Sequence, residues 1–83
     1  MIPVKEAVAS AFAHIKDVFG TNLPGLQLEE VERVGNRWRI TVSFLQEDVP
    51  IPIPVPKYHR VYKEIAVDGA TGACDSIKIR QLQ

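Results

Sequence analysis

The sequence has little cysteine, few aromatic side chains and no excess charge of either sign, and each shortage removes a class of protein. Its 83 residues include one cysteine, Cys74, so no internal disulfide can form and we expect the cytoplasm rather than an oxidising compartment. No apolar run approaches the roughly 20 residues of a membrane-spanning helix, and Lys5 and Glu6 stand where a signal peptide would be apolar. We therefore expect a soluble, untargeted chain without a membrane partner. Ten basic residues balance ten acidic ones, so net charge favours no particular partner.

The sequence also lacks the motifs of common catalytic and cofactor-binding sites. It has no glycine-rich phosphate loop, and its two histidines and one cysteine do not show the spacing of metal ligands. Cys74 lies beside the last predicted turn, at the far end of the predicted strand 57–67 from His59, so the two are expected about 25 to 30 Å apart, too far for the histidine to activate the thiol. We therefore expect a noncatalytic protein that binds no cofactor and no metal.

What the sequence does contain is a regular alternation of apolar and polar residues at positions 37–45. Trp38, Ile40, Val42 and Phe44 fall on one face, and Arg37, Arg39, Thr41 and Ser43 fall on the other. This period of two is typical of a strand with one buried face. It predicts a strand at about 37–46 that forms the centre of an antiparallel sheet.

A helix is predicted before this strand, over residues 3–19. Apolar residues recur there at steps of three and four, which places them on one stripe of a helix: Val4, Val8, Ala11, Phe12, Ile15, Val18 and Phe19. Pro3 suits the first turn, and Gly20 suits the residue that ends a helix. No good N-cap side chain precedes the helix.

Three further strands are predicted at about 26–34, 57–67 and 73–81. Gly35 and Asn36 form a two-residue hairpin loop, with glycine where a type II′ turn requires it. The alternation in 26–34 changes phase, which predicts a bulge near Glu29 or Glu30. Lys63 shares the apolar phase of its strand, so it must lie near an edge or extend its ammonium group to solvent.

Together these elements predict an α+β protein in which an N-terminal amphipathic helix packs on one face of a four-stranded antiparallel meander sheet, as a single domain over residues 1–83. The helix is expected to cover the apolar face that carries Trp38, Ile40, Val42, Phe44, Ile65, Val67, Ile77 and Ile79. The opposite face is expected to be open to solvent.

A proline-rich connector at 49–56 separates the second and third predicted strands. Four prolines alternate there with Val49, Ile51, Ile53 and Val55. A residue before proline is restricted to extended geometry, so the connector is stiff. The prolines remove N–H donors from one edge only, while the valines and isoleucines keep theirs on the other. Two interpretations stay open: a rigid connector that packs on its own domain, and an apolar surface for a protein partner or for self-association as a homodimer.

The late segment 62–72, with sequence YKEIAVDGATG, resembles the Y-x-V-x-V-D-A-x-T-G ending of PepSY-like domains, and it matches that motif at Asp68, Thr71 and Gly72. The plan of a helix followed by a sheet is also similar to cystatin-like folds. More distantly, the order of tryptophan strand, proline-bearing link, tyrosine strand and Asp-Gly turn is similar to gas vesicle accessory proteins of the O type. The PepSY-like resemblance implies a noncatalytic module, since such domains serve as inhibitory or chaperone-like parts of secreted peptidases or of envelope proteins.

The outer sheet face offers a second candidate surface. Its cationic and aromatic residues are Arg37, Arg39, Tyr58, Arg60, Tyr62, Lys78 and Arg80. Cations beside aromatic rings on an open sheet are typical of single-stranded nucleic acid binders, although Glu64 interrupts the patch. The sequence therefore favours a noncatalytic protein-protein interaction or regulatory module that self-associates through the proline-rich segment, with nucleic acid binding as the alternative.

Overall fold

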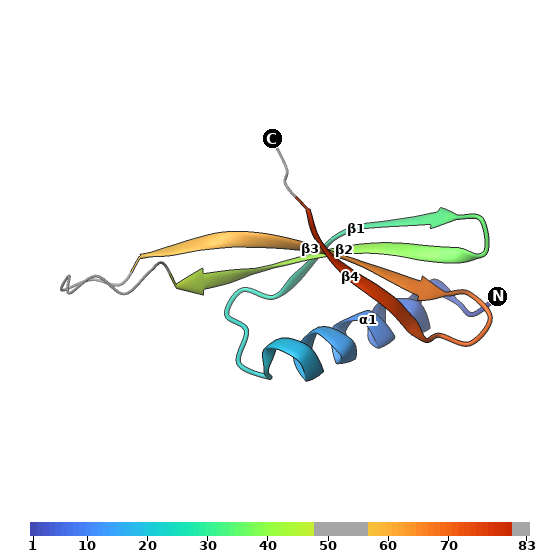
Figure 1. Ribbon diagram of the computed structural model, residues 1–83, viewed down its shortest axis with the longest axis horizontal. Helices are drawn as coiled ribbons and strands as arrows, with labels where there is room; N and C mark the ends of the chain where they lie inside the picture. The colour runs from blue at the N-terminus through green and yellow to red at the C-terminus, as the bar shows by residue number, and fades with distance from the viewer. Residues whose placement is uncertain (48–56, 81–83) are drawn as a thin grey trace.

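The chain forms one helix and one antiparallel sheet (Figure 1), as seen in a computed structural model that describes residues 1–47 and 57–80. The elements are α1 (Val4–Phe19), β1 (Gln27–Val34), β2 (Arg37–Glu47), β3 (Tyr58–Asp68) and β4 (Cys74–Arg80). The strands lie in the order β1-β2-β3-β4, and every neighbouring pair is antiparallel. This confirms the predicted α+β fold with an N-terminal helix on a four-stranded meander, and each element begins and ends within one residue of its expected limits.

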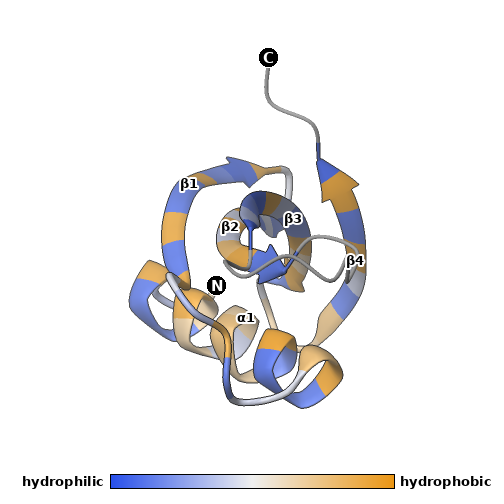
Figure 2. Cartoon of the chain, turned by 90° about the vertical axis from the view of Figure 1, so that its left-hand side faces the viewer, coloured by the Kyte–Doolittle hydropathy of each residue, from blue (hydrophilic) through white to orange (hydrophobic). Residues whose placement is uncertain are grey.

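The helix α1 lies on one face of the sheet, with β1 and β4 at the two sides (Figure 2). It turns Ala7, Ala11 and Ile15 into the interior, where all three are fully buried. Two members of the predicted stripe, Val4 and Val18, are instead 42% and 54% exposed at the ends of the helix. Pro3 stands just before the helix in extended geometry and provides no side-chain cap. Gly20 has a φ of 98°, and its N–H donates to the carbonyl oxygen of Lys16 at 2.9 Å, so the helix ends at a residue that tolerates positive φ.

The β1–β2 hairpin has the predicted two-residue turn and the predicted bulge. Val34 pairs with Arg37, and Gly35 has a φ of 62°. Asn36 has no positive φ, which fits a type II′ turn and not a type I′ turn. The register shifts between Leu28 and Glu30, so Glu29 is the extra residue of a bulge.

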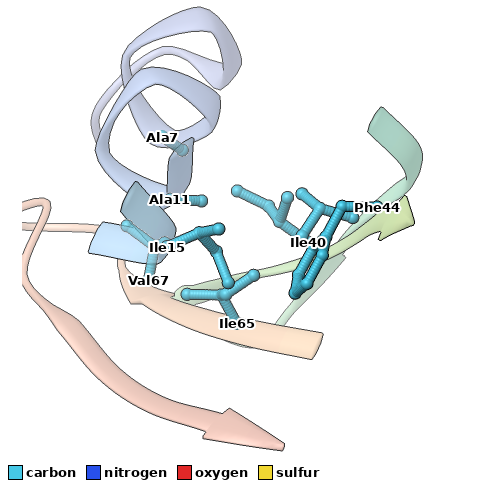
Figure 3. Close-up of a cluster of buried hydrophobic side chains, with 8 residues drawn as sticks. Ala7, Ala11, Ile15, Ile40, Phe44, Ile65 and Val67 are labelled. Carbon is cyan, nitrogen blue, oxygen red and sulfur yellow. The ribbon is translucent and has the colours of Figure 1, made fainter. Parts of the chain in front are cut away.

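The hydrophobic core lies between α1 and the middle of the sheet (Figure 3). Eight buried apolar side chains form it: Ala7, Ala11, Ile15, Ile40, Val42, Phe44, Ile65 and Val67. Trp38 and Ile77 pack against this cluster while partly exposed, and the Trp38 indole N–H donates to the carbonyl oxygen of Ile2 at 3.2 Å. The prediction of which sheet residues face the helix is therefore confirmed for most of them.

Ile79 is the exception, because its side chain is 77% exposed. It pairs with Lys63 on the helix side of the sheet, as the alternation predicted. However, β4 diverges from α1 toward its C-terminal end (Figure 1), so no helical side chain covers Ile79. The prediction that Ile79 is part of the buried face was wrong.

Lys63 reaches solvent from the interior of the sheet. Its strand β3 has neighbours on both sides, so an edge position is excluded. The ammonium nitrogen lies 5.4 Å from the ring centre of Phe19, and this ring in turn packs against Phe44 with centroids 5.7 Å apart. The end of α1 thus holds the cation in a cation–π contact.

The turn between β3 and β4 is held by Asp68. Its carboxylate accepts hydrogen bonds from the backbone N–H groups of Ala70 and Thr71 at 2.8 and 3.0 Å, as expected of aspartate in such a turn. These two bonds, first Thr71 and then Ala70, lower the pKa of Asp68 from its ordinary value. Gly69 packs against the carbonyl oxygen of Asn36, where a Cβ atom would come within 2.4 Å. The two turns at this end of the sheet are therefore in backbone contact.

Candidate functional site

The cationic and aromatic patch predicted from the sequence does share one face of the sheet. The β2–β3 and β3–β4 registers place its seven members on the face opposite α1: Arg37, Arg39, Tyr58, Arg60, Tyr62, Lys78 and Arg80. The sheet therefore brings together residues that are up to 43 positions apart in the chain.

Two of its arginines are neutralised by carboxylates of the same face. Arg39 is bound by Glu32 from β1 at 2.7 Å and by Glu64 from β3 at 3.0 Å. Arg37 lies 3.2 Å from the carboxylate of Asp75. Because these side chains are partly exposed, each pair contributes little to stability, about 0 to 1 kcal/mol, but the pairs consume the charge that a phosphate would need.

Arg80 links the last strand to the first. Its guanidinium forms an ion pair with Glu30 of β1 and donates to the hydroxyl of Thr41, at 2.5 Å, on β2. The side chain thus extends from β4 across β3 to Thr41 of β2, where its guanidinium meets the carboxylate of Glu30 from β1. Thr41 lies underneath and is fully buried.

Arg60 of β3 covers the part of the outer face around Ser43. It donates to the carbonyl oxygen of Gly25 at 2.9 Å and to the hydroxyl of Ser43 at 2.8 Å. The Ser43 hydroxyl then donates its one hydrogen to the carboxylate of Glu29 at 2.5 Å. This bond, followed by one from Gln27, lowers the pKa of Glu29 from its ordinary value.

The prediction that the outer face is open to solvent was therefore wrong for the centre of that face. Thr41 and Ser43 have no exposed surface, because charged side chains from β1, β3 and β4 fold over these two small residues. Two hollows of about 170 and 200 Å³ remain beside Arg39. Both are smaller than the roughly 300 to 1,000 Å³ of typical small-molecule sites.

The remaining patch members keep more surface. Tyr58 is 52% exposed, Tyr62 is half-buried, and Lys78 is exposed. Among residues 1–47 and 57–80, Lys78 forms no ion pair. The face presents one unpaired lysine and two tyrosines beside a layer of paired arginines.

The structure places Cys74 and His14 on the walls of one hollow, a pair that sequence reasoning did not consider. Both line an open hollow of about 500 Å³ between α1 and β4, together with Ser10, Ala13, Asp17 and Gly72. The thiol lies 3.6 Å from the carbonyl oxygen of Ser10, and burial, with a smaller effect of Asp75, raises the pKa of the Cys74 thiol. A raised pKa favours the thiol over the reactive thiolate. Within the part of the chain that the structure describes, no group of three or more histidine, cysteine, aspartate or glutamate side chains is placed to hold a metal ion.

The second predicted surface, formed by Val49, Ile51, Ile53 and Val55, lies outside the described residues. The strands that lead to it are described. β1 begins its pairing at Ser43 and β4 ends its pairing at Tyr62, so the last residues of β2 and the first of β3 continue as a two-stranded ribbon. This ribbon projects past α1 (Figure 1).

Fold and surfaces define the chain as a small two-layer α+β module with a largely charge-paired outer face and a projecting ribbon. No protein-family model, curated protein or solved structure matches this chain. The PepSY-like and cystatin-like resemblances therefore stay predictions. No helix in the described ranges is long and apolar enough to cross a membrane.

Proposed function

We propose that this protein is a noncatalytic protein-protein interaction module that self-associates, as a homodimer, through its proline-rich segment. The observation that carries the proposal is the β2–β3 ribbon. Among the described residues the ribbon has no third strand beyond Ser43 and Tyr62, and its last pair, Glu47 and Tyr58, flanks the proline-rich segment in the sequence. The segment alternates proline with valine and isoleucine, and exposed apolar surface commonly marks an interface.

The chemistry of the described surfaces supports a binding role over a catalytic one. The Cys74 thiol has a raised pKa, and four carboxylates of the outer face are engaged with arginines or a hydroxyl group: Glu29, Glu30, Glu32 and Glu64. A catalytic nucleophile or base needs a pKa shifted toward its working pH, and the shifts found here run away from it. The single cysteine keeps the cytoplasm as the proposed compartment.

Single-stranded nucleic acid binding is the second candidate. It is favoured by the shared outer face of Tyr58, Tyr62 and Lys78, which offers two rings and a cation. It is disfavoured by the pairing of Arg37 and Arg39 with carboxylates. Retention on single-stranded RNA or DNA that falls steeply with salt would establish this function instead.

The test of the first candidate is the mass of the protein in solution. We expect the wild-type chain to dimerise and the double variant Ile51→Ser, Ile53→Ser to be a monomer, because serine removes the apolar side chains from the segment. The matched control is Val18→Ser, Val34→Ser, which changes two exposed valines outside the segment, at 54% and 44% exposure. The control should keep the wild-type mass. A double isoleucine variant that stays dimeric would refute the proposal.

A further inference from the structure

The strand β4 lies at one edge of the sheet and has an open side. Among the described residues, β4 pairs with β3 alone, so every second residue of β4 directs its backbone N–H and C=O groups away from the sheet without a partner strand. Such an edge is a template for a further strand. The two rows of side chains beside this edge therefore decide which kind of strand can pair with it.

The helix-side row of β4 is apolar toward its C-terminal end. Ile77 is half-buried and Ile79 is 77% exposed, because β4 diverges there from α1 (Figure 1). A strand added at the open edge would place its own helix-side residues directly beside these two isoleucines. Apolar side chains at those positions would remove the exposed surface of Ile79 from water.

The outer row of β4 carries one cation without a partner. Arg80 is turned away from the open edge, because its guanidinium forms an ion pair with Glu30 and donates to the hydroxyl of Thr41. Lys78 is exposed and forms no ion pair within residues 1–47 and 57–80. An acidic residue opposite Lys78 on an added strand would supply the missing partner.

We propose that β4 accepts, as a fifth strand, an extended segment of another protein in which one acidic residue stands between two apolar residues. The faces of β4 require this order: the apolar side chains lie beside Ile77 and Ile79, and the acidic one between them lies beside Lys78. Backbone hydrogen bonds of the added strand supply affinity, and its three side chains supply specificity. This surface does not include the proline-rich segment, so binding here is independent of the proposed self-association.

The opposite edge, β1, does not suit the same segment. Its register is interrupted by the bulge at Glu29, and the carboxylates of Glu30 and Glu32 lie on its outer face. An acidic residue of an added strand would there stand beside like charges, which destabilise a cross-strand pair. On the helix side, Arg33 lies opposite Trp38, and an inward-pointing charge acts against strand addition. An acidic and apolar segment is therefore directed to β4.

The β4 strand of a second copy is a poorer occupant. Two antiparallel β4 strands can pair with Ile77, Lys78 or Ile79 opposite its own copy. These three registers place Lys78 opposite Ser76, Lys78 or Arg80, respectively. None of these partners is acidic, and two of them are cations. Lysine at this edge thus acts against self-pairing and favours an acidic partner.

The test titrates the isotope-labelled full chain with two synthetic peptides and follows the amide signals by NMR. One peptide has the sequence Ser-Thr-Val-Glu-Val-Thr-Ser with blocked ends, and the other has lysine in place of glutamate. We expect the largest shift changes and slowed hydrogen exchange on β4, and about fivefold tighter binding of the glutamate peptide. The variant Lys78→Glu should invert this preference, so that the lysine peptide binds more tightly.

Two control variants match the two kinds of contact. Lys5→Glu makes the same charge change at an exposed position of α1, on the other face of the sheet, and should keep the wild-type preference. Ile79→Ser should weaken the binding of both peptides about threefold, because it removes apolar surface beside the added strand. Val34→Ser changes a β1 side chain that is 44% exposed and should leave both affinities unchanged.

A wild-type chain that binds the two peptides equally, or binds neither at millimolar concentration, would overturn the proposal. A Lys78→Glu variant that keeps the wild-type preference would do the same, as would shift changes that are largest on β1. The mass of the chain without peptide, which tests the proposed self-association, does not enter any of these outcomes.

Discussion

Replacement of Ile65 by alanine is expected to remove a large part of the stability of this protein. Ile65 is fully buried in β3, between Ile40 and Ile77 across the sheet and beneath α1. The change deletes three carbon atoms, which costs about 2.4 kcal/mol in transfer free energy at about 0.8 kcal/mol each, and the cavity left behind brings the total to about 3 to 4 kcal/mol. A chain of 83 residues has an unfolding free energy of about 4 to 12 kcal/mol. The variant should therefore unfold at a temperature about 12 to 25 °C lower than the wild type.

The measurement is urea and thermal unfolding followed by circular dichroism. Ile65→Val should cost about 0.5 to 1.5 kcal/mol, because it removes one carbon atom from the same site. The control Val18→Ala changes a helical side chain that is 54% exposed and should stay within about 0.5 kcal/mol of the wild type. If Ile65→Ala cost less than about 1 kcal/mol, Ile65 would not lie in a packed core between helix and sheet.

Two further predictions concern titratable groups. Ser43→Ala removes the hydroxyl that lowers the pKa of Glu29, so this pKa should rise toward its ordinary value, as read from the carboxyl carbon by NMR; an unchanged titration would contradict the contact. The folded pKa of Glu29 is lower than the unfolded one, so ionised Glu29 stabilises the wild type above the ordinary carboxyl pKa and loses that contribution as pH falls through the folded value. This dependence on pH should be weaker in the variant, which keeps the hydrogen bond from Gln27. Burial raises the pKa of the Cys74 thiol, so iodoacetamide at pH 8 should alkylate the native protein more slowly than the unfolded chain. Equal rates in the two states would show that the thiol is not protected.

Most of the fold could be predicted because its determinants are local. The period-two alternation of Trp38 to Phe44 defines the central strand, and the stripe through Ile15 defines the helix. The glycine at position 35 predicts the type II′ turn, because this turn needs a positive φ at its first central residue. The change in the alternation of apolar and polar residues around Glu29 predicts the position of the bulge to within one residue. Each of these signals depends on residues that are close in the sequence.

What could not be predicted depends on how elements lie relative to one another. Ile79 is exposed because β4 runs away from α1 toward its C-terminal end. The alternation of apolar and polar residues in the sequence cannot predict that path. The burial of Ser43 follows from the reach of Arg60, seventeen positions away, and from the bulge that turns Glu29 toward it. The hollow that Cys74 and His14 share likewise requires that α1 lie beside β4.

The outer face shows how charge pairing changes the meaning of a motif. A count of cations and tyrosines on one sheet face predicts affinity for nucleic acid. The three-dimensional arrangement adds Glu32, Glu64 and Asp75 as partners of two of those arginines. These carboxylates come from three strands, so their effect on the patch is visible only once the register is known.

The measurement that tests the central claim most directly is sedimentation equilibrium of the wild-type chain at several concentrations. Self-association through the proline-rich segment predicts a mass that rises with concentration from the monomer value of 9.3 kDa to twice that value and no further. A mass of 9.3 kDa at every concentration would contradict the account, and a mass that continued to grow beyond two chains would contradict a homodimer.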